Sequence, residues 1–408
     1  MPQVKPEMET FAKIKVVGIG GAGGAAVNRM VNAKIRGVDF VVMNTDVQAL
    51  HHNFAATKLH LGKSITRGLG AGMDPEIGFK AAEESQNEIR DLLKETDMVF
   101  ITCGLGGGTG SGAGPIVAEI AHDLGALTVA VVTKPFSFEG PQRRDIAEGA
   151  WERLARQVDT IITIPNDRVL QVIDKKTTLL ETFRIVDEIL RQGVQGISEL
   201  ITVPGLINVD FADVKTIMKN TGSAMMGIGS AKGDNRAVEA AQMAISSPLL
   251  ELSIDGAHGI LFTVTGSSNL AMSEINEAAK IVTSSAADDA KVIWGTVIDD
   301  SLDDEMRINV IATGFDSHRP ATVIDSDSAP IGFLGGKYAP SNFLRRTQKD
   351  DEDQEKKFKQ FTQKSAPPES TNFPTRAKRV DELLDTEEKK SNQDDLEIPA
   401  FIRKKMGI

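Results

Sequence analysis

The sequence predicts an α/β fold: a doubly wound parallel sheet joined by a long central helix to a smaller α/β domain. Apolar strand-like runs alternate with helical patterns through the first half of the chain, and glycine-rich loops follow the runs at 14–20 and 98–102. Such alternation is typical of parallel sheets with helices on both faces. Ligands of these sheets bind at the carboxyl ends of the strands, which is where both glycine loops fall.

The elements of the first half follow from the spacing of apolar residues. A further helix follows the second glycine loop, and Pro115 is expected in its first turn because proline suits that position. The remaining predicted elements are strands at 14–20, 40–43, 98–102, 127–132 and 160–164, and helices at 21–31, 75–94 and 141–158.

A long amphipathic helix is predicted from Thr178 to Ile201, with Thr178 and Glu181 forming a capping box at its start. At roughly 30 Å it is long enough to join two domains. A second, smaller sheet with hairpin-like closure at its end is expected after it. Its predicted elements are helices at 209–219, 236–246 and 273–285, and strands at 223–230, 260–265, 292–298 and 307–314.

The composition limits the functional classes. The chain has 408 residues, of which 41% are hydrophobic, and this is enough for two domains and a tail. Its net charge of −11 argues against nucleic acid as a partner. Cys103 is the single cysteine, so a reducing compartment is expected. Without a long apolar run or an apolar N-terminal segment, the sequence predicts a cytoplasmic protein.

The stretch from Gly104 to Pro115, GLGGGTGSGAGP, is typical of a phosphate cradle. Glycine lets successive backbone N–H groups approach an anion, and the start of the following helix adds its positive end. A glycine run can also be a flexible linker. The strand before this run and the helix after it favour the cradle.

A second glycine loop leaves one alternative open. Gly18, Gly20 and Gly23 match the G-x-G-x-x-G pattern of dinucleotide-binding folds, which would suit a nicotinamide-dependent oxidoreductase with Asp39 or Asp46 on the ribose. One dinucleotide needs one glycine loop. Two loops suit a triphosphate that is held from both sides.

The run GGGTGSG, from Gly106 to Gly112, resembles the signature of the tubulin and FtsZ superfamily. Other stretches are similar to the family's nucleotide loops: GGAGGA at 20–25, NTD at 44–46, RGLGAG at 67–72, KPFSFEGPQR at 134–143 and PND at 165–167. The resemblance implies a GTPase that binds GTP and GDP, with Mg²⁺ bound through the phosphates and no metal ligand assigned to a side chain. It implies nucleotide contacts from Gly20, Gly21, Ala22, Gly23, Gly24, Ala25, Asn44, Ala71, Gly72, Gly106, Gly107, Gly108, Thr109, Gly110, Glu139, Arg143, Asn166, Phe183 and Asp187.

Three of these positions have a more specific expectation. In the family, residues matching Phe183 and Asp187 stack on guanine and accept its N1 and N2 hydrogens. A carboxylate accepts two parallel donors from guanine but faces a lone pair on adenine, so Asp187 favours GTP over ATP. Ala25 departs from the family, whose first loop usually has Asn there, and this puts nucleotide affinity or turnover in doubt.

The stretch GLINVDFADV, from Gly205 to Val214, contains the candidate catalytic residues Asn208, Asp210 and Asp213. Carboxylates at a helix start are also ordinary capping groups. In the family, the corresponding loop enters the nucleotide site of the next subunit and its acidic residues polarise the attacking water. The resemblance therefore implies a head-to-tail homopolymer, because a site split between two faces gives a contact that does not close.

The sequence changes character at Asp316, where few aliphatic residues remain. We divide the chain into a disordered arm at 1–11, a GTP-binding domain at 12–176, the central helix at 177–203, the second domain at 204–315, a disordered linker at 316–391 and a partner-binding peptide at 392–408. In that peptide, apolar residues return beside a basic cluster, which is typical of a docking motif. Its candidate contacts are Asp395, Leu396, Ile398, Pro399, Phe401 and Ile402.

The ending of the chain is similar to the family peptide that binds membrane tethers. It favours the bacterial division protein of the family over other tubulin-like filament proteins, which remain the alternative. The resemblance thus implies filaments that form the division ring (Z ring) at mid-cell. They would be held at the inner face of the membrane by adaptors of the FtsA, ZipA or SepF type, with contact to the membrane only through these adaptors.

Overall fold

The computed structural model describes residues 12–171, 173–174, 176–203, 205–207, 209–247 and 254–315. The predicted N-terminal arm, linker and partner-binding peptide lie outside the described residues, as does the candidate catalytic residue Asn208.

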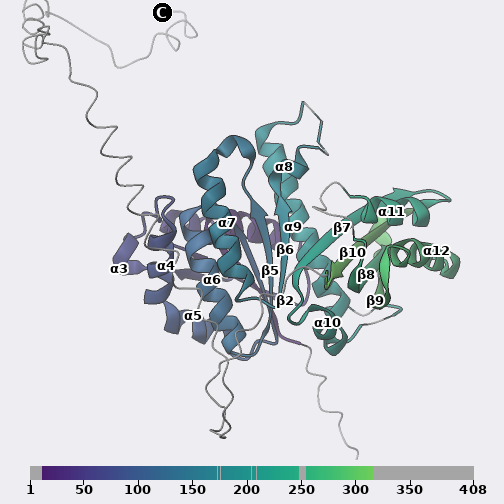
Figure 1. Cartoon of the computed structure of the whole chain (residues 1–408), viewed down its shortest axis with the longest axis horizontal. Helices are drawn as coiled ribbons and strands as arrows, with labels where there is room; N and C mark the ends of the chain where they lie inside the picture. The colour runs from purple at the N-terminus through teal and green to yellow at the C-terminus, as the bar shows by residue number, and fades with distance from the viewer. Residues whose placement is uncertain are drawn as a thin grey trace, which may run out of the picture. The chain divides into compact units, whose positions relative to one another are not determined.

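In the described part of the chain, ten strands form one sheet in the order β3-β2-β1-β4-β5-β6-β7-β10-β8-β9 (Figure 1). Strands β1 to β6 are parallel, as predicted from the strand–helix alternation. The bounds are β1 (Ile14–Ile19), β2 (Val38–Asn44), β3 (Thr57–His60), β4 (Met98–Gly104), β5 (Leu127–Lys134), β6 (Thr160–Pro165), β7 (Gly222–Lys232), β8 (Ala257–Gly266), β9 (Ala286–Ile298) and β10 (Glu305–Thr313).

The second half of the chain continues this sheet and does not form a separate one. β7 joins β6 in parallel over a short stretch, from the pair Thr160–Gly222 to the pair Ile162–Ala224. The predicted hairpin-like closure is wrong, since β10 lies antiparallel between β7 and β8 and leaves β9 at the edge beside β8. The nearly continuous burial of β10 is typical of a central strand and explains this placement.

Helices cover both faces of the sheet. α1, α9 and α10 contribute to the core on one face, and α4, α5, α6 and α7 to the core on the other. A third core lies between α11, α12 and the strands of the second domain. The bounds are α1 (Gly20–Asn32), α2 (Val47–His51), α3 (Lys63–Thr66), α4 (Pro75–Glu84), α5 (Gln86–Leu93), α6 (Gly108–Asp123), α7 (Pro141–Ala155), α8 (Asn166–Val169), α9 (Leu179–Thr202), α10 (Phe211–Met218), α11 (Arg236–Ile245) and α12 (Met272–Thr283).

Two predicted helices differ in the structure. The helix expected at 75–94 is divided at the buried Ser85, whose hydroxyl oxygen accepts a hydrogen bond from the Gly62 N–H at 3.2 Å. The helix expected to start at Pro115 begins at Gly108, so Pro115 lies in its interior. Close packing explains the glycine-rich start of α6, because a Cβ on Gly112 would lie 2.1 Å from the carbonyl oxygen of Pro75 in α4.

The predicted long helix is present as α9, which has 24 residues and lies between the two domains in Figure 1. Its N-cap is Thr178, whose side chain accepts a hydrogen bond from the Glu181 N–H at 3.2 Å. The buried residues of α9 include Val186, Leu190 and Val194, which pack in the core that it shares with α1 and the sheet.

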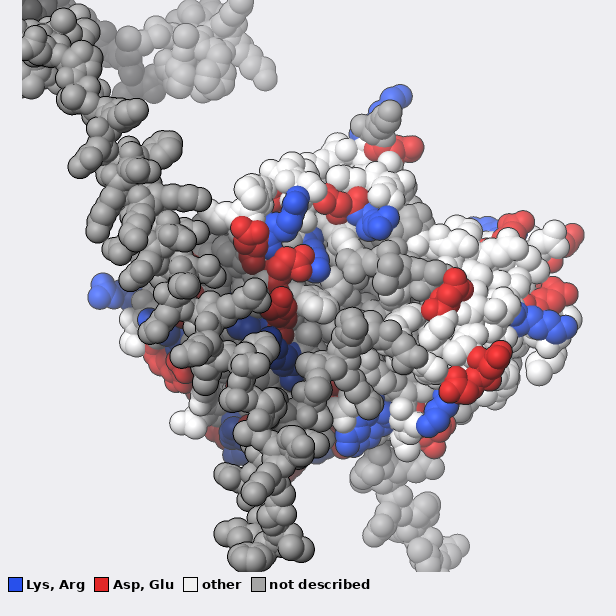
Figure 2. Space-filling view, in the orientation of Figure 1, with Lys and Arg blue, Asp and Glu red and all other residues white. Residues whose placement is uncertain are grey.

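Acidic and basic side chains lie interspersed on the face shown in Figure 2. In the part of the chain that the structure describes, none of the helices combines the length and apolarity that a membrane crossing requires.

Candidate nucleotide site

The candidate site lies where the strand order of the sheet reverses. From β1 the chain builds β2 and β3 on one side, and from β4 it builds β5 and β6 on the other. Such a switch point opens a crevice at the carboxyl ends of the strands. A cavity of about 370 Å³ lies there, lined by Ile19, Gly20, Gly21, Ala22, Met73, Gly104, Leu105, Gly107, Gly108, Thr109, Gly110, Thr133, Pro135, Glu139, Arg143, Asn166 and Phe183.

Two helices direct their N-termini at this cavity. α1 begins at Gly20 and α6 at Gly108, and both residues line it. Neither helix has a side-chain cap, in contrast to α4, where Asp74 accepts a hydrogen bond from the Glu76 N–H. The first N–H groups of a helix have no intrahelical partner, so α1 and α6 can offer theirs to an anion.

The two glycine loops lie against each other, as the interpretation of two cradles for one triphosphate requires. Gly20 has a φ of +73°, which favours glycine, and a Cβ there would lie 3.1 Å from the Gly110 nitrogen. The hydroxyl oxygen of Thr109 lies 2.6 Å from that of Thr45, which follows β2. The NTD stretch at 44–46 therefore contacts the glycine signature at 106–112.

A second side of the cavity is formed by the segment after β5. Glu139 accepts a hydrogen bond from the Phe136 N–H at 2.9 Å and forms an ion pair with Arg143. Asn166, at the start of α8, is 6% exposed, and its side-chain oxygen has no hydrogen-bond partner in the described structure. Buried polar atoms rarely stay unpaired, so this oxygen is suited to a ligand hydroxyl.

The aromatic side of the cavity is formed by α9. The ring of Phe183 contacts the ring of Phe136 edge-on, with centroids 5.7 Å apart, and remains 42% exposed. One turn further, Asp187 is mostly buried and its Oδ2 lies 3.8 Å from the Nε of Arg29 on α1. Burial raises the pKa of Asp187 to about 6, although the Arg29 charge acts in the opposite direction.

Eleven of the predicted nucleotide contacts line the cavity and eight do not. Of the eight, Gly23 serves packing, because a Cβ there would lie 2.3 Å from the carbonyl oxygen of Thr102. Asn44 is buried, and its side-chain oxygen accepts from the Asp46 N–H. Ala25 is exposed on α1. The complete set outside the lining is Gly23, Gly24, Ala25, Asn44, Ala71, Gly72, Gly106 and Asp187.

Six residues that line the cavity were not among the predicted contacts, although Gly104, Leu105 and Pro135 lie within the predicted cradle and nucleotide loops. Ile19 and Gly104 are the last residues of β1 and β4, and Thr133 lies near the end of β5. Their places at the carboxyl ends of the strands are the signal that could have identified them. The six are Ile19, Met73, Gly104, Leu105, Thr133 and Pro135.

The carboxylates Asp210 and Asp213 do not line the cavity. Asp210 is the N-cap of α10, where its Oδ1 accepts a hydrogen bond from the Asp213 N–H at 2.7 Å, so the ordinary capping role is present. Both residues are exposed. In Figure 1, α10 lies at the bottom of the view, whereas α8, which begins with the cavity residue Asn166, lies at the top.

Two family models match the chain. Residues 13–174 match the GTPase domain of the Tubulin/FtsZ family, and residues 222–316 match the C-terminal domain of the FtsZ family. The first range contains all residues that line the cavity at the strand switch (the strand-switch cavity) except Phe183. The second range begins with β7, beyond the long helix.

Solved structures agree with both matches. An empty FtsZ dimer from M. jannaschii is 48% identical, covers 75% of this chain and 89% of its own, and superposes with a TM-score of 0.73. A point mutant of the same FtsZ is 47% identical, covers 75% of this chain and 92% of its own, and gives the same TM-score of 0.73.

CetZ2 from Haloferax volcanii, a protofilament with GTPγS, shares the fold at 21% identity and a TM-score of 0.62, covering 74% of this chain and 92% of its own. The matches with the M. jannaschii proteins have more than twice this identity over a similar share of the chain. The dinucleotide-binding alternative is therefore set aside. The chain belongs to the FtsZ family of tubulin-like, filament-forming GTPases of cell division.

Proposed function

We propose that GTP is hydrolysed in a site shared between adjacent subunits of a head-to-tail filament. One subunit would supply the strand-switch cavity with the nucleotide, and the next would supply Asp210 and Asp213. The observation that carries this proposal is the separation within one molecule: the cavity is lined by the two glycine loops and Phe183, yet neither Asp210 nor Asp213 lines it. When the two halves of a site lie on different faces of one chain, each subunit binds the next head to tail, and repeated contacts of this kind build an open filament.

The cavity suits a guanine nucleotide. The N-termini of α1 and α6 provide N–H donors for the phosphates, and the half-exposed ring of Phe183 offers a stacking surface for the base. Asp187, one turn from Phe183, provides the acceptor pair that would select guanine. Glu139, Arg143 and Asn166 also line the cavity and would contact the sugar and the adjoining phosphate.

Mg²⁺ is expected to bind chiefly through the phosphates. Among the residues that line the cavity, Glu139 is the one carboxylate, and it is engaged with Arg143 and the Phe136 N–H. The donor set therefore fits a cation that is held by the nucleotide and its waters. Bound in this way, Mg²⁺ would neutralise phosphate charge during hydrolysis.

The reaction needs positioning more than covalent chemistry. Water attacks the γ-phosphorus, the bond to the bridging oxygen of GDP breaks, and inorganic phosphate leaves. The backbone N–H groups of the two glycine loops would stabilise the phosphate charge, and the Asp210 carboxylate of the next subunit would orient the water and accept its proton. Hydrolysis then depends on assembly.

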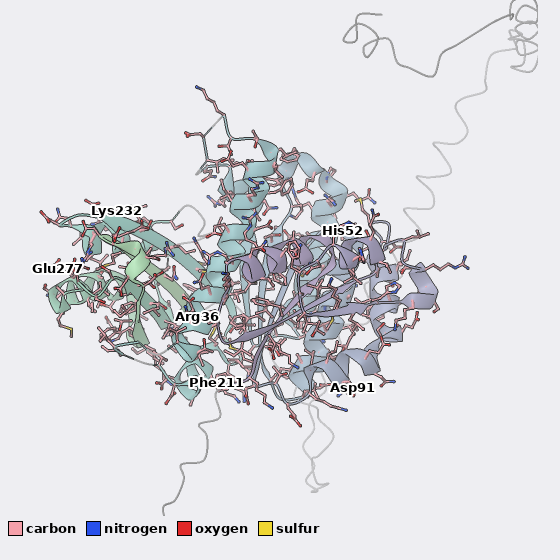
Figure 3. All side chains as sticks on the ribbon, turned by 180° about the vertical axis from the view of Figure 1, so that it is seen from behind. Arg36, His52, Asp91, Phe211, Lys232 and Glu277 are labelled. Atoms are coloured by element: carbon pink, nitrogen blue, oxygen red, sulfur yellow. The ribbon has the colours of Figure 1, made fainter. Side chains whose placement is uncertain are left out.

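The test separates the charge of Asp210 from its capping role. Asp210→Ser keeps a good N-cap, whereas Asp210→Ala removes it and should cost about 1 kcal/mol of stability. Both variants should bind GTP as the wild type does, and turnover should fall on the order of a hundredfold. Glu277→Ser is the control, because Figure 3 places Glu277 at the outer side of the same domain, away from Phe211 next to Asp210.

Phosphate release per molecule is then measured against total protein concentration. For the wild type it should rise steeply as filaments form. If dilute wild-type protein hydrolyses GTP as fast per molecule as concentrated protein, or if Asp210→Ser keeps full turnover, the shared site is wrong.

We further propose that the filaments form the division ring at mid-cell, on the cytoplasmic face of the membrane. Membrane-tethering adaptors would dock on the C-terminal peptide at 392–408, whose contact candidates, Asp395 to Ile402, lie outside the described residues. Truncation after Phe315, which packs against the core of the second domain, should preserve GTP-dependent pelleting and abolish adaptor binding. Loss of pelleting in the truncated protein would contradict this division of roles.

A further inference from the structure

The loop that leads to Asp210 is held by the edge strand β9. The Thr296 N–H donates a hydrogen bond to the Ile207 carbonyl oxygen at 3.2 Å. In return, the Ile207 N–H donates to the Thr296 hydroxyl oxygen at 3.1 Å. One residue of β9 thus satisfies both backbone groups of Ile207, three positions before Asp210, and forms an isolated antiparallel bridge with it.

The surroundings of this bridge are closely packed. Thr296 is 2% exposed, although it lies on an edge strand, because the loop covers it. The neighbouring Gly295 allows a close approach, since a Cβ there would lie 3.1 Å from the Ile207 carbonyl oxygen and 3.2 Å from the Val209 side chain. Val209 is itself buried in the core that includes Val214 of α10.

These contacts fix the start of α10 from two sides. On one side the bridge between Ile207 and Thr296 fixes the chain before the helix, and on the other Asp210 caps the first turn. Leu206 and the Asp210 side chain remain exposed. The exposed carboxylate is thus presented between the bridged Ile207 and the capped first turn of α10.

We propose that Thr296 is a positioning residue for GTP hydrolysis, which holds the backbone of Ile207 and thereby sets the place of Asp210 in the neighbouring subunit's site. This inference rests on the proposed shared site. Thr296 acts through its hydroxyl oxygen, which accepts from the Ile207 N–H, and does not line the nucleotide cavity. Small displacements of a catalytic group lower turnover strongly.

Thr296→Val tests the hydroxyl, because valine keeps the shape of the side chain and its fit in a strand. GTP binding by dilute protein and the amount of filament pelleted with GTP should match the wild type. Phosphate release per pelleted subunit should fall about tenfold. Thr296→Ser restores the hydroxyl and should recover most of the turnover, which a merely structural loss would not predict.

A matched control removes a different buried hydroxyl. Thr313 is fully buried on β10 and donates to the Ile217 carbonyl oxygen, near the other end of α10, at 3.0 Å. Thr313→Val should lower the unfolding temperature about as much as Thr296→Val and leave turnover per pelleted subunit near the wild-type rate.

The outcomes separate the two proposals. If Thr296→Val keeps full turnover while Asp210→Ser loses it, the positioning role is overturned and the shared site stands. If Asp210→Ser also keeps full turnover, the shared site itself fails. Equal loss of turnover in Thr296→Val and Thr313→Val would also overturn the positioning role, since general destabilisation would then explain both.

Discussion

The guanidinium Nε of Arg29 lies 3.8 Å from Oδ2 of Asp187, beyond hydrogen-bond distance, and is buried with no hydrogen-bond partner in the described structure. Arg29 therefore stabilises the Asp187 carboxylate only in part. The pKa of Asp187 is raised to about 6 by burial, against the effect of Arg29. This carboxyl is thus set to titrate near the lower end of the physiological pH range.

GTP binding should weaken in acid, because a protonated Asp187 can no longer accept both guanine donors. With a pKa of about 6, affinity at pH 5 should be about tenfold below that at pH 8. Titration of dilute protein with GTP across this range measures the effect. Asp187→Asn should bind GTP weakly at every pH. If its affinity still falls about tenfold between pH 8 and pH 5, a group other than Asp187 is responsible for the titration.

The same carboxyl should make the fold less stable as pH rises. Its folded pKa of about 6 exceeds the ordinary 3.8, so the folded state binds the proton more tightly. The resulting stabilisation is fully present below pH 4 and is lost by pH 6 to 7, a difference of roughly 2 to 3 kcal/mol. Urea unfolding of Asp187→Asn without nucleotide should lack this contribution, and a pH profile identical to the wild type would contradict the assignment.

Phe183 should contribute to nucleotide affinity and little to stability. Its ring is 42% exposed beside Phe136, so Phe183→Ala loses a stacking surface, which is worth about 1 to 3 kcal/mol of binding. Phe183→Tyr keeps the ring and should bind nearly as the wild type does. Leu180→Ala removes an exposed apolar side chain from the same helix and controls for changes in α9. Unchanged affinity in Phe183→Ala would exclude it as the base platform.

Five strands and the longer helices of the first domain could be predicted from their apolar spacing, whereas the short β3, with the sequence TKLH, and the short helices α2 and α3 were not predicted. Cys103 is buried near the end of β4, and burial raises its pKa to about 12. The sequence could not show that β10 lies between β7 and β8, because strand order depends on contacts between distant segments. Local spacing instead suggested that consecutive strands pair.

The sequence predicted the glycine loops of the cavity, and the family resemblance added Glu139, Arg143, Asn166 and Phe183, which also line it. Thr133 and Ile19 enter it as ends of strands, which requires the strand order. Asp187 is not among the lining residues and lies beside Arg29, so its contact with the base stays a prediction. The capping role of Asp210 is local and is visible in one molecule. A catalytic role would involve a second molecule, so the structure of a single chain reveals only the capping role.

The glycines of the signature should differ sharply in their tolerance of a methyl group. A Cβ on Gly112 would lie 2.1 Å from the Pro75 carbonyl oxygen and 2.5 Å from the Phe79 nitrogen, both in the backbone of α4. The backbone must therefore move, and Gly112→Ala should lower the free energy of unfolding by about 3 kcal/mol.

Gly107 provides the comparison, because a Cβ there meets nothing within 4 Å and its φ of −93° suits alanine. Gly107→Ala should change the free energy of unfolding by less than about 0.5 kcal/mol. It lines the cavity, however, so its methyl group should hinder the phosphates and weaken GTP binding. Urea unfolding and GTP titration of both variants distinguish the roles: equal stability of the two would mean that Gly112 is not required for the packing of α6 on α4.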